Sequence, residues 1–326
     1  MSVESNHRQP ASRRGVAAMA AALALALAAS LAACAPGTRA AAASPRPPRE
    51  PLIEVDDVYR FYALYDATAG QPTAEQLQQY LDAGSVGLRV FAEQRRTTGV
   101  RIAEAIARSP DTFAQARRCV EPLPRVRRRL GDALATLGRL YPEARFPPVT
   151  IAIGRGKPVG IGSPVTGVQI GLEALCATDY LNPDVEDRFV HVIAHEFVHV
   201  QQAPELSDGE SLTVLEASLM EGAAEFVTEL ISGNVAYSHL PPLVAGRETE
   251  IEGAFLRDKA RRDLSDWIGN GTPDKPGDFG YWVGYRIAKA HYSHATDKRQ
   301  ALREILEVRD AEAFLAASGW YPGMAL

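Results

Sequence analysis

The segment His195-Glu196-Phe197-Val198-His199 lies inside a continuous run, residues 187–202 (DRFVHVIAHEFVHVQQ), with the composition of a single helix. Residues 182–184 (Asn-Pro-Asp) mark its start, because a capping side chain is followed by proline in the first turn. A wide apolar face predicts that this helix is buried and that its histidines face the interior or a cleft. This face contains Phe189, Val190, Ile193, Ala194, Phe197 and Val198.

His195 and His199 are four residues apart, so they share one face of the helix and can bind one metal ion. Glu196 stands beside them, where it can hold a water molecule. Two neutral imidazoles that bind zinc, with a glutamate as general base, form the HExxH arrangement of peptide-bond hydrolysis. The alternative is a core helix whose histidines are only hydrogen-bonded. His191 continues the stripe one turn earlier and is expected to pack or to support the site, because a third ligand there would strain tetrahedral geometry.

A catalytic zinc site needs a third protein ligand, and residues 210–232 have the composition of a second helix. Glu221 and Glu225 are four apart and share one face of it. We expect Glu221 to be the third ligand and Glu225 to orient one histidine through its second ring nitrogen. Glu216 and Glu229 are the competing candidates.

HEFVH, followed 22 residues after its second histidine by EGAAE, resembles the gluzincin branch of zinc metallopeptidases. With residues 280–285 (GYWVGY), it resembles more narrowly a bacterial family of predicted zinc-dependent proteases, often exported; the resemblance covers residues 149–293. It implies one Zn²⁺ per chain on His195, His199 and Glu221, with Glu196 as the catalytic base. Some relatives carry aspartate where this chain has Glu225.

The resemblance also implies a predominantly helical α+β fold, with a zincin-like metallopeptidase core and a small β-sheet before the HExxH helix. Residues 168–172 alternate like a strand, and the strand preceding such a helix is expected to run along the cleft and pair with extended substrate backbone. An ordinary structural hairpin is the alternative. The domain prediction is a helical region over residues 52–145, forming one wall of the cleft, and a zincin-like catalytic region over 146–326.

Peptide hydrolysis also needs a donor to the developing oxyanion. Tyr281, Tyr285 and Tyr292 share one face of a late helix, and we favour Tyr285 slightly over Tyr281, with His291 as another candidate. The alternative is that this aromatic stripe belongs to the core.

Residues 1–33 have the features of an export signal, with Arg13-Arg14 before an uncharged Ala/Leu run. The ending Leu31-Ala32-Ala33-Cys34 resembles a bacterial lipobox, which predicts lipidation of Cys34 and anchoring in the cell envelope, on the periplasmic side of an outer membrane. An ordinary cleaved signal and a retained membrane helix are the alternatives. Residues 34–51 are rich in Pro, Ala and Arg and are predicted to be a disordered tether.

With a net charge of -5 and no dense basic run joined to aromatic residues, the chain gives no support to a nucleic-acid partner. The basic cluster at residues 125–129 is expected to be a solvated helix face. Cys119 and Cys176 can form a disulfide or remain two buried thiols. The expected partner is a peptide or protein substrate; the alternative function is a non-catalytic zinc-binding lipoprotein that acts as a binding or assembly module of the envelope.

Overall fold

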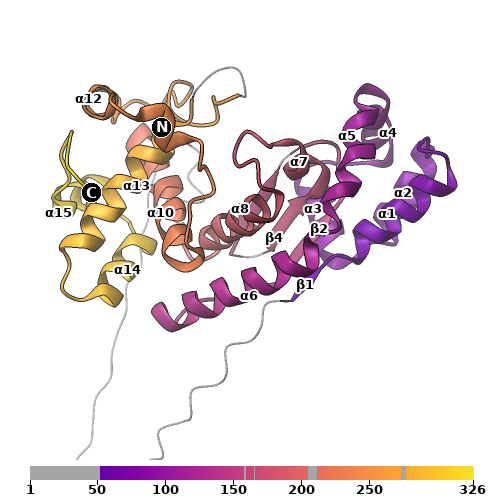
Figure 1. Ribbon diagram of the computed structural model, residues 1–326, viewed down its shortest axis with the longest axis horizontal. Helices are drawn as coiled ribbons and strands as arrows, with labels where there is room; N and C mark the ends of the chain where they lie inside the picture. The colour runs from indigo at the N-terminus through magenta and orange to yellow at the C-terminus, as the bar shows by residue number, and fades with distance from the viewer. Residues whose placement is uncertain (1–51, 158, 165, 205–210, 273–276) are drawn as a thin grey trace, which may run out of the picture. The chain divides into compact units, whose positions relative to one another are not determined.

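The computed structural model describes residues 52–157, 159–164, 166–204, 211–272 and 277–326, which belong to one compact unit, Pro47–Leu326 (Figure 1). The predicted export signal, the lipidation site Cys34 and the tether lie outside the described residues. Among the residues that are described, no helix has both the length and the apolar character that crossing a bilayer requires.

The described part of the chain is mostly helical and contains one four-stranded sheet, which confirms the α+β prediction. Its strands are β1 (Ile53–Glu54), β2 (Val149–Ala152), β3 (Gly160–Ser163) and β4 (Gly167–Gly171), in the order β1-β2-β4-β3. β2 runs parallel to both β1 and β4, whereas β3 and β4 form an antiparallel pair.

The strand at residues 168–172 does not border a cleft as expected. It corresponds to β4, whose two edges are occupied by β2 and β3, so its backbone groups are not free to pair with a substrate. The strand at this edge of the sheet is β3, in a segment of the sequence rich in glycine and proline. The glycines of β3 carry little strand propensity of their own, and pairing with β4 is what fixes their extended conformation.

Helices fill the region between β1 and β2. They are α1 (Asp56–Ala67), α2 (Ala74–Asp82), α3 (Val86–Gln94), α4 (Gly99–Arg108), α5 (Pro110–Ala116), the 3₁₀ turn η1 (Arg117–Cys119) and α6 (Leu123–Leu140). The side chains of Thr73, Ser85 and Thr98 cap α2, α3 and α4 by accepting backbone N–H groups of the first turn. Because α1 and α3 pack on β2, these helices share one core with the sheet.

Cys119 and Cys176 form a disulfide, with their Cα atoms 6.0 Å apart. The bridge joins η1 to α7 (Leu172–Ala177), the helix directly after β4. Of the two alternatives that the sequence left open, the structure therefore has the bridge.

The HExxH segment lies at the end of α8 (Val185–His199), which begins one residue after Asp184, whose side chain accepts the N–H of Asp187. Asn182 instead accepts the N–H of Asp184, so the cap lies two residues later than the sequence indicated. α8 is almost completely buried between the sheet and helices α6 and α10 (Val214–Ser232). Thr213 and Glu216 form a capping box at the start of α10, and Gly233 ends it in the left-handed conformation.

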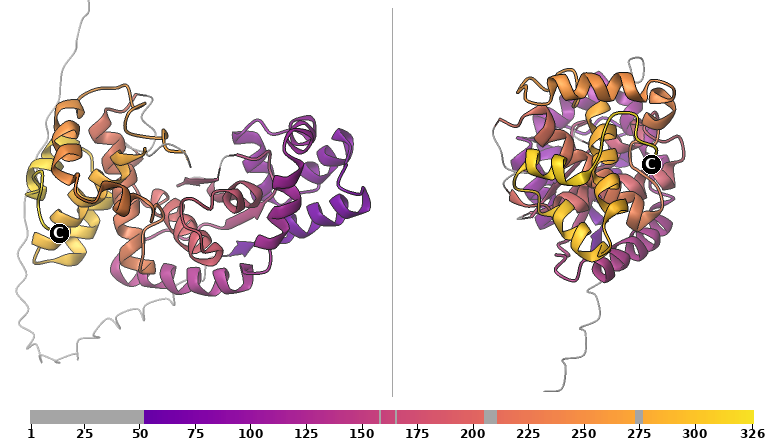
Figure 2. Two further views of the ribbon diagram at one scale, coloured as in Figure 1. Left: turned by 45° about the horizontal axis from the view of Figure 1, so that its top comes forward. Right: turned by 90° about the vertical axis from the view of Figure 1, so that its left-hand side faces the viewer.

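α10 packs closely along α13 (Phe279–His294), where two glycines face each other. A Cβ atom on Gly222 would lie 2.1 Å from the carbonyl carbon of Gly284, so only glycine permits this approach. The remaining helices are α11 (Leu240–Val244), α12 (Glu248–Asp258), α14 (Lys298–Leu306) and α15 (Ala311–Ser318). All four pack against α13, and Figure 2 shows α12, α14 and α15 from two further sides.

Candidate metal centre

Three side chains from α8 and α10 converge on one point. The Nε2 atoms of His195 and His199 lie 3.1 Å apart, and Oε2 of Glu221 lies 3.1 Å from the first and 3.3 Å from the second. The helical spacing of four brings the histidines together, and the packing of α10 on α8 brings Glu221 to them. These three residues form a cluster that could hold a metal ion.

The dimensions of this cluster suit a small tetrahedral ion. Ligand atoms about 2.0–2.1 Å from a tetrahedral zinc are separated from one another by about 3.3 Å. The three observed separations, 3.1, 3.1 and 3.3 Å, are close to that value. Two imidazoles and one carboxylate also form a donor set that catalytic zinc sites use, with one position left for water or substrate.

The second ring nitrogens of both histidines are also held. Nδ1 of His195 lies 2.6 Å from Oε1 of Glu225, a residue that is 2% exposed and whose other oxygen accepts the backbone N–H of Tyr237. Nδ1 of His199 lies 2.8 Å from Oε1 of Gln202, whose amide nitrogen donates to the carbonyl oxygen of Met220. Such partners fix the orientation of a metal-binding imidazole. Sequence reasoning did not find Gln202, although its position one turn after His199 was a usable signal.

The charges of the cluster are strongly coupled. Burial alone would lower the pKa of His195, but the adjacent carboxylates of Glu221 and Glu225 outweigh it and raise that pKa to about 10. Burial alone would raise the pKa of Glu221, but the two histidines hold it far below its ordinary value. Burial raises the pKa of Glu196, although both histidines oppose the shift.

A cavity of about 410 Å³ opens beside the cluster and contains Glu196 in its wall. β3 forms part of this wall, and its glycines allow it to lie directly against α8. A Cβ atom on Gly160 would lie 2.7 Å from Oε1 of Glu196, and one on Gly162 would lie 1.8 Å from the carbonyl oxygen of Glu196. Gly160 therefore makes room for the Glu196 carboxylate, and Gly162 lets β3 approach the backbone of α8.

Two tyrosines, Tyr237 and Tyr281, also line the cavity. Their rings stack with centroids 4.4 Å apart, and the ring of Tyr281 lies 6.0 Å from that of His195. Burial and the charge of Glu221 raise the pKa of both hydroxyls well above the ordinary value, so both keep their protons. Tyr237 lies in the loop after α10 and was not identified from the sequence.

The preference for Tyr285 over Tyr281 does not agree with this geometry. The Tyr285 hydroxyl donates to Oε2 of Glu229 at 2.9 Å and accepts from Nζ of Lys289 at 2.5 Å. It borders a separate cavity of about 110 Å³, which Glu225 also lines. Tyr285 lies one helical turn after Tyr281 on α13 and does not line the cavity beside the cluster. Glu229, the competing ligand candidate, is hydrogen-bonded in the same network with Tyr285 and Lys289.

The other candidates also have partners elsewhere. His291 lies 2.8 Å from Oε2 of Glu304, and Tyr292 packs on Phe226 with ring centroids 5.2 Å apart. Glu216 belongs to the capping box of α10.

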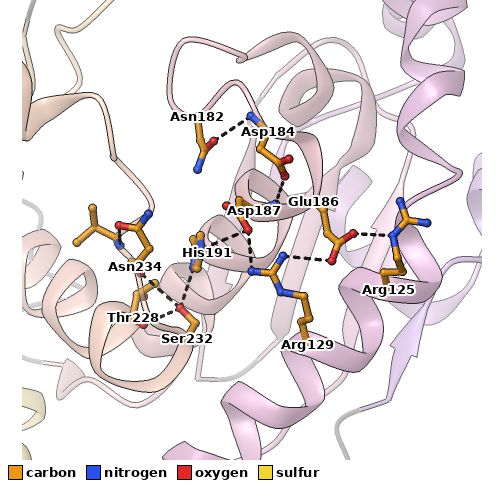
Figure 3. A network of polar contacts seen from close by, with 11 residues as sticks. Arg125, Arg129, Asn182, Asp184, Glu186, Asp187, His191, Thr228, Ser232 and Asn234 are labelled. Carbon is orange, nitrogen blue, oxygen red and sulfur yellow. Dashed lines mark hydrogen bonds and ion pairs between the residues drawn. The ribbon is translucent and has the colours of Figure 1, made fainter.

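His191 supports the packing of α8 and does not join the cluster. Its Nδ1 lies 2.8 Å from Oγ of Ser232 on α10, and its Nε2 lies 4.0 Å from Asp187 (Figure 3). Arg125 and Arg129 of α6 pair with the first turn of α8 at Glu186 and Asp187, with separations from 2.6 to 3.1 Å (Figure 3). The basic cluster is thus accessible to solvent, as expected, but two of its arginines also fix α6 to the start of the HExxH helix.

The fold and site together define an α+β protein with a candidate metal centre between two buried helices. No protein-family model, curated protein or solved structure matches this chain.

Proposed function

We propose that the protein is a zinc-dependent peptidase of gluzincin type. The convergence of His195, His199 and Glu221 at separations that suit zinc, beside Glu196 in an open cavity, is the observation that supports this proposal most directly. Both histidines of the cluster are already held by a partner, His195 by Glu225 on α10 and His199 by Gln202 just after α8.

In this proposal the two histidines and Glu221 hold the ion, and Glu225 and Gln202 orient the imidazoles. Bound zinc would supply a Lewis acid that polarises a carbonyl group and makes water a better nucleophile. Glu196 accepts a proton from the attacking water at its carboxylate and returns it to the leaving amine. Burial raises the pKa of Glu196, which brings it closer to the value that suits a base and acid near neutral pH.

An extended peptide fits the cavity along β3. Among the described residues β3 pairs only with β4, and residues 159–162 line the cavity beside Glu196. A peptide can add to such an edge through its main chain. The hydroxyls of Tyr237 and Tyr281, which line the same cavity, are the candidate donors to the oxyanion.

We also propose that the protein is exported and anchored by a lipid at Cys34. The sequence before residue 52 supports this part of the proposal, and the Cys119–Cys176 disulfide agrees with an oxidising compartment such as the bacterial periplasm. Metabolic labelling with a radioactive fatty acid tests it, because Cys34→Ala should abolish incorporation.

The decisive experiment measures zinc content and peptide cleavage in full-length wild-type protein and three variants. We expect one zinc per chain in the wild type and in Glu196→Gln, and loss of zinc in Glu221→Ala. Glu225→Ala should retain zinc at saturating metal concentration but bind it about 10–100-fold more weakly. Glu196→Gln should lower turnover of a peptide library by about a hundredfold or more.

Absence of zinc from folded wild-type protein would overturn the proposed function. Zinc binding without cleavage of any peptide would instead support the non-catalytic envelope module.

A further inference from the structure

Arg95 brings a positive charge into the cavity from a part of the chain to which the sequence assigned no chemistry. It follows the last residue of α3 and lines the same cavity as His195 and Glu196. Its side chain is partly buried, and burial lowers the pKa of the guanidinium while the charge of Glu196 opposes the shift.

The Arg95 guanidinium has no carboxylate partner in the described part of the chain. No Asp or Glu oxygen among those residues lies within 4.0 Å of it, and its Nε is buried without a hydrogen-bond acceptor. Glu196 acts on it only through a longer-range attraction. Buried arginines are normally paired, since an unpaired buried charge is costly.

Arg155 lies next to Arg95, and it also has no carboxylate partner among the described residues. Its Nη2 donates to the carbonyl oxygen of Arg95 at 3.4 Å, and its Nε is also buried without an acceptor. The two positive charges repel, which lowers the pKa of Arg95 further. A structure that holds two neighbouring guanidinium groups without an anion is prepared to receive one.

The backbone under both arginines is rigidly held. The N–H of Arg95 donates to the carbonyl oxygen of Phe91, whose ring packs against Gly154. The loop that carries Arg155 is fixed by Glu173, 1% exposed, whose Oε1 accepts the N–H groups of Gly154 and Gly156 at 3.0 and 2.8 Å. The backbone from which both guanidinium groups extend is therefore held without a ligand.

We propose that Arg95, assisted by Arg155, binds a carboxylate group of the substrate and so determines the specificity of the cavity. This inference rests on the proposed peptidase function. The carboxylate can be the free C-terminus of a peptide or an acidic side chain near the cleaved bond. A planar guanidinium suits either group, because it donates two parallel hydrogen bonds to a carboxylate.

The test uses four peptides of one sequence, which combine a C-terminal acid or amide with an internal Glu or Gln. Their binding to full-length, zinc-loaded Glu196→Gln protein is measured by fluorescence anisotropy, and their cleavage is measured with otherwise wild-type protein. We expect one of the two carboxylates to improve binding and kcat/KM by about tenfold to a hundredfold. Arg95→Gln should abolish this preference, and Arg95→Lys should restore part of it.

Arg96→Gln is the matched control, because Arg96 is exposed and lines a different cavity. The C-terminal pair of peptides and the internal pair identify which carboxylate is bound. Equal treatment of acidic and neutral peptides by the wild type would overturn the inference. If Arg95→Gln lowered kcat/KM equally for all four peptides, the inference would also be overturned, because Arg95 would then act only through Glu196.

The binding experiment separates this inference from the proposed function. Cleavage without a carboxylate preference retains the peptidase and removes the role of Arg95. Carboxylate-dependent binding that Arg95→Gln abolishes supports the role of Arg95 even if no peptide is cleaved.

Discussion

At the scale of single residues, His195 lies between two carboxylates that have different roles. Glu221 faces the nitrogen that points to the metal position, and Glu225 faces the opposite ring nitrogen. The spacing of four between these glutamates places both beside one imidazole. Without a metal, the carboxylates of Glu221 and Glu225 keep His195 protonated. When a metal binds, His195 loses this proton, because a metal-bound imidazole is neutral.

Zinc binding is therefore expected to release at least one proton per chain at pH 7. The two carboxylates raise the pKa of His195 to about 10 in the metal-free protein, whereas a metal-bound imidazole is neutral. Affinity for zinc should thus rise with pH up to about 10. Calorimetric titration with zinc at pH 7, in two buffers of different ionisation enthalpy, measures the released protons. Identical heats in both buffers would contradict this prediction.

The same pKa has a consequence for the stability of the metal-free protein. A folded-state pKa of His195 raised above the unfolded value of about 6.5 stabilises the fold fully below pH 6.5. That contribution is lost as the pH rises from there through about 10. The metal-free protein should lose this share of its free energy of unfolding over that range, while the zinc-loaded protein, whose His195 is neutral, should not.

Two tyrosines one turn apart on α13 provide a third prediction at this scale. Tyr281→Phe should lower kcat by about a hundredfold with zinc content unchanged, because it removes a candidate donor to the oxyanion. Tyr285→Phe should leave kcat within about twofold and lower the free energy of unfolding by about 1 kcal/mol, because it removes a hydrogen bond to Glu229. Steady-state kinetics and urea unfolding of both variants measure these effects, and the reverse order of kcat would return the role to Tyr285.

At the scale of elements, the sequence predicts a helix best where caps, apolar periodicity and candidate metal ligands occur in the same segment. Caps and apolar periodicity place the HExxH helix and the helix of Glu221 to within four residues at each end. The edge strand β3 could not be predicted in this way, because Gly-Ile-Gly-Ser becomes a strand only by pairing with β4. Arg95 and Tyr237 reach the cavity through tertiary packing, which no spacing in the sequence encodes.

The crossing of α10 and α13 is the element contact that fixes Glu221. Gly222→Ala should lower the free energy of unfolding by about 3 kcal/mol or more, because its Cβ would lie 2.1 Å from backbone of Gly284 and the helices would have to separate. It should also weaken zinc binding, since Glu221 is the adjacent residue. Urea unfolding midpoints and zinc titrations test both effects.

Gly131→Ala is the matched control for this substitution. Gly131 lies inside α6, where an added Cβ would meet no atom within 4 Å apart from the neighbouring helix backbone, so alanine should stabilise the protein by about 0.5–1 kcal/mol. If both alanine variants stabilised the protein, close contact between α10 and α13 would not be required.

At the scale of the whole molecule, the region before residue 146 is part of the candidate site as well as its support. It contributes Arg95 to the cavity, one strand to the sheet and one cysteine to the disulfide. The two arginines of α6 that pair with the start of α8 add a further link. The domain boundary that the sequence predicted at residue 145 would therefore separate one part of the cavity wall from the metal cluster beside it.

The disulfide provides the prediction for this scale. It closes a loop over a sequence separation of 57 residues, for which loss of chain entropy in the unfolded state is worth about 4 kcal/mol. Reduction of the wild type should lower the free energy of unfolding by about this amount. The double variant Cys119→Ala/Cys176→Ala is the control, since it should be less stable than the oxidised wild type and insensitive to reductant.

Zinc content should persist in folded, reduced protein, because the three ligands lie on α8 and α10, outside the bridged segment. Loss of zinc on mild reduction would instead show that the bridge, and with it the position of α7 before α8, holds the metal cluster together.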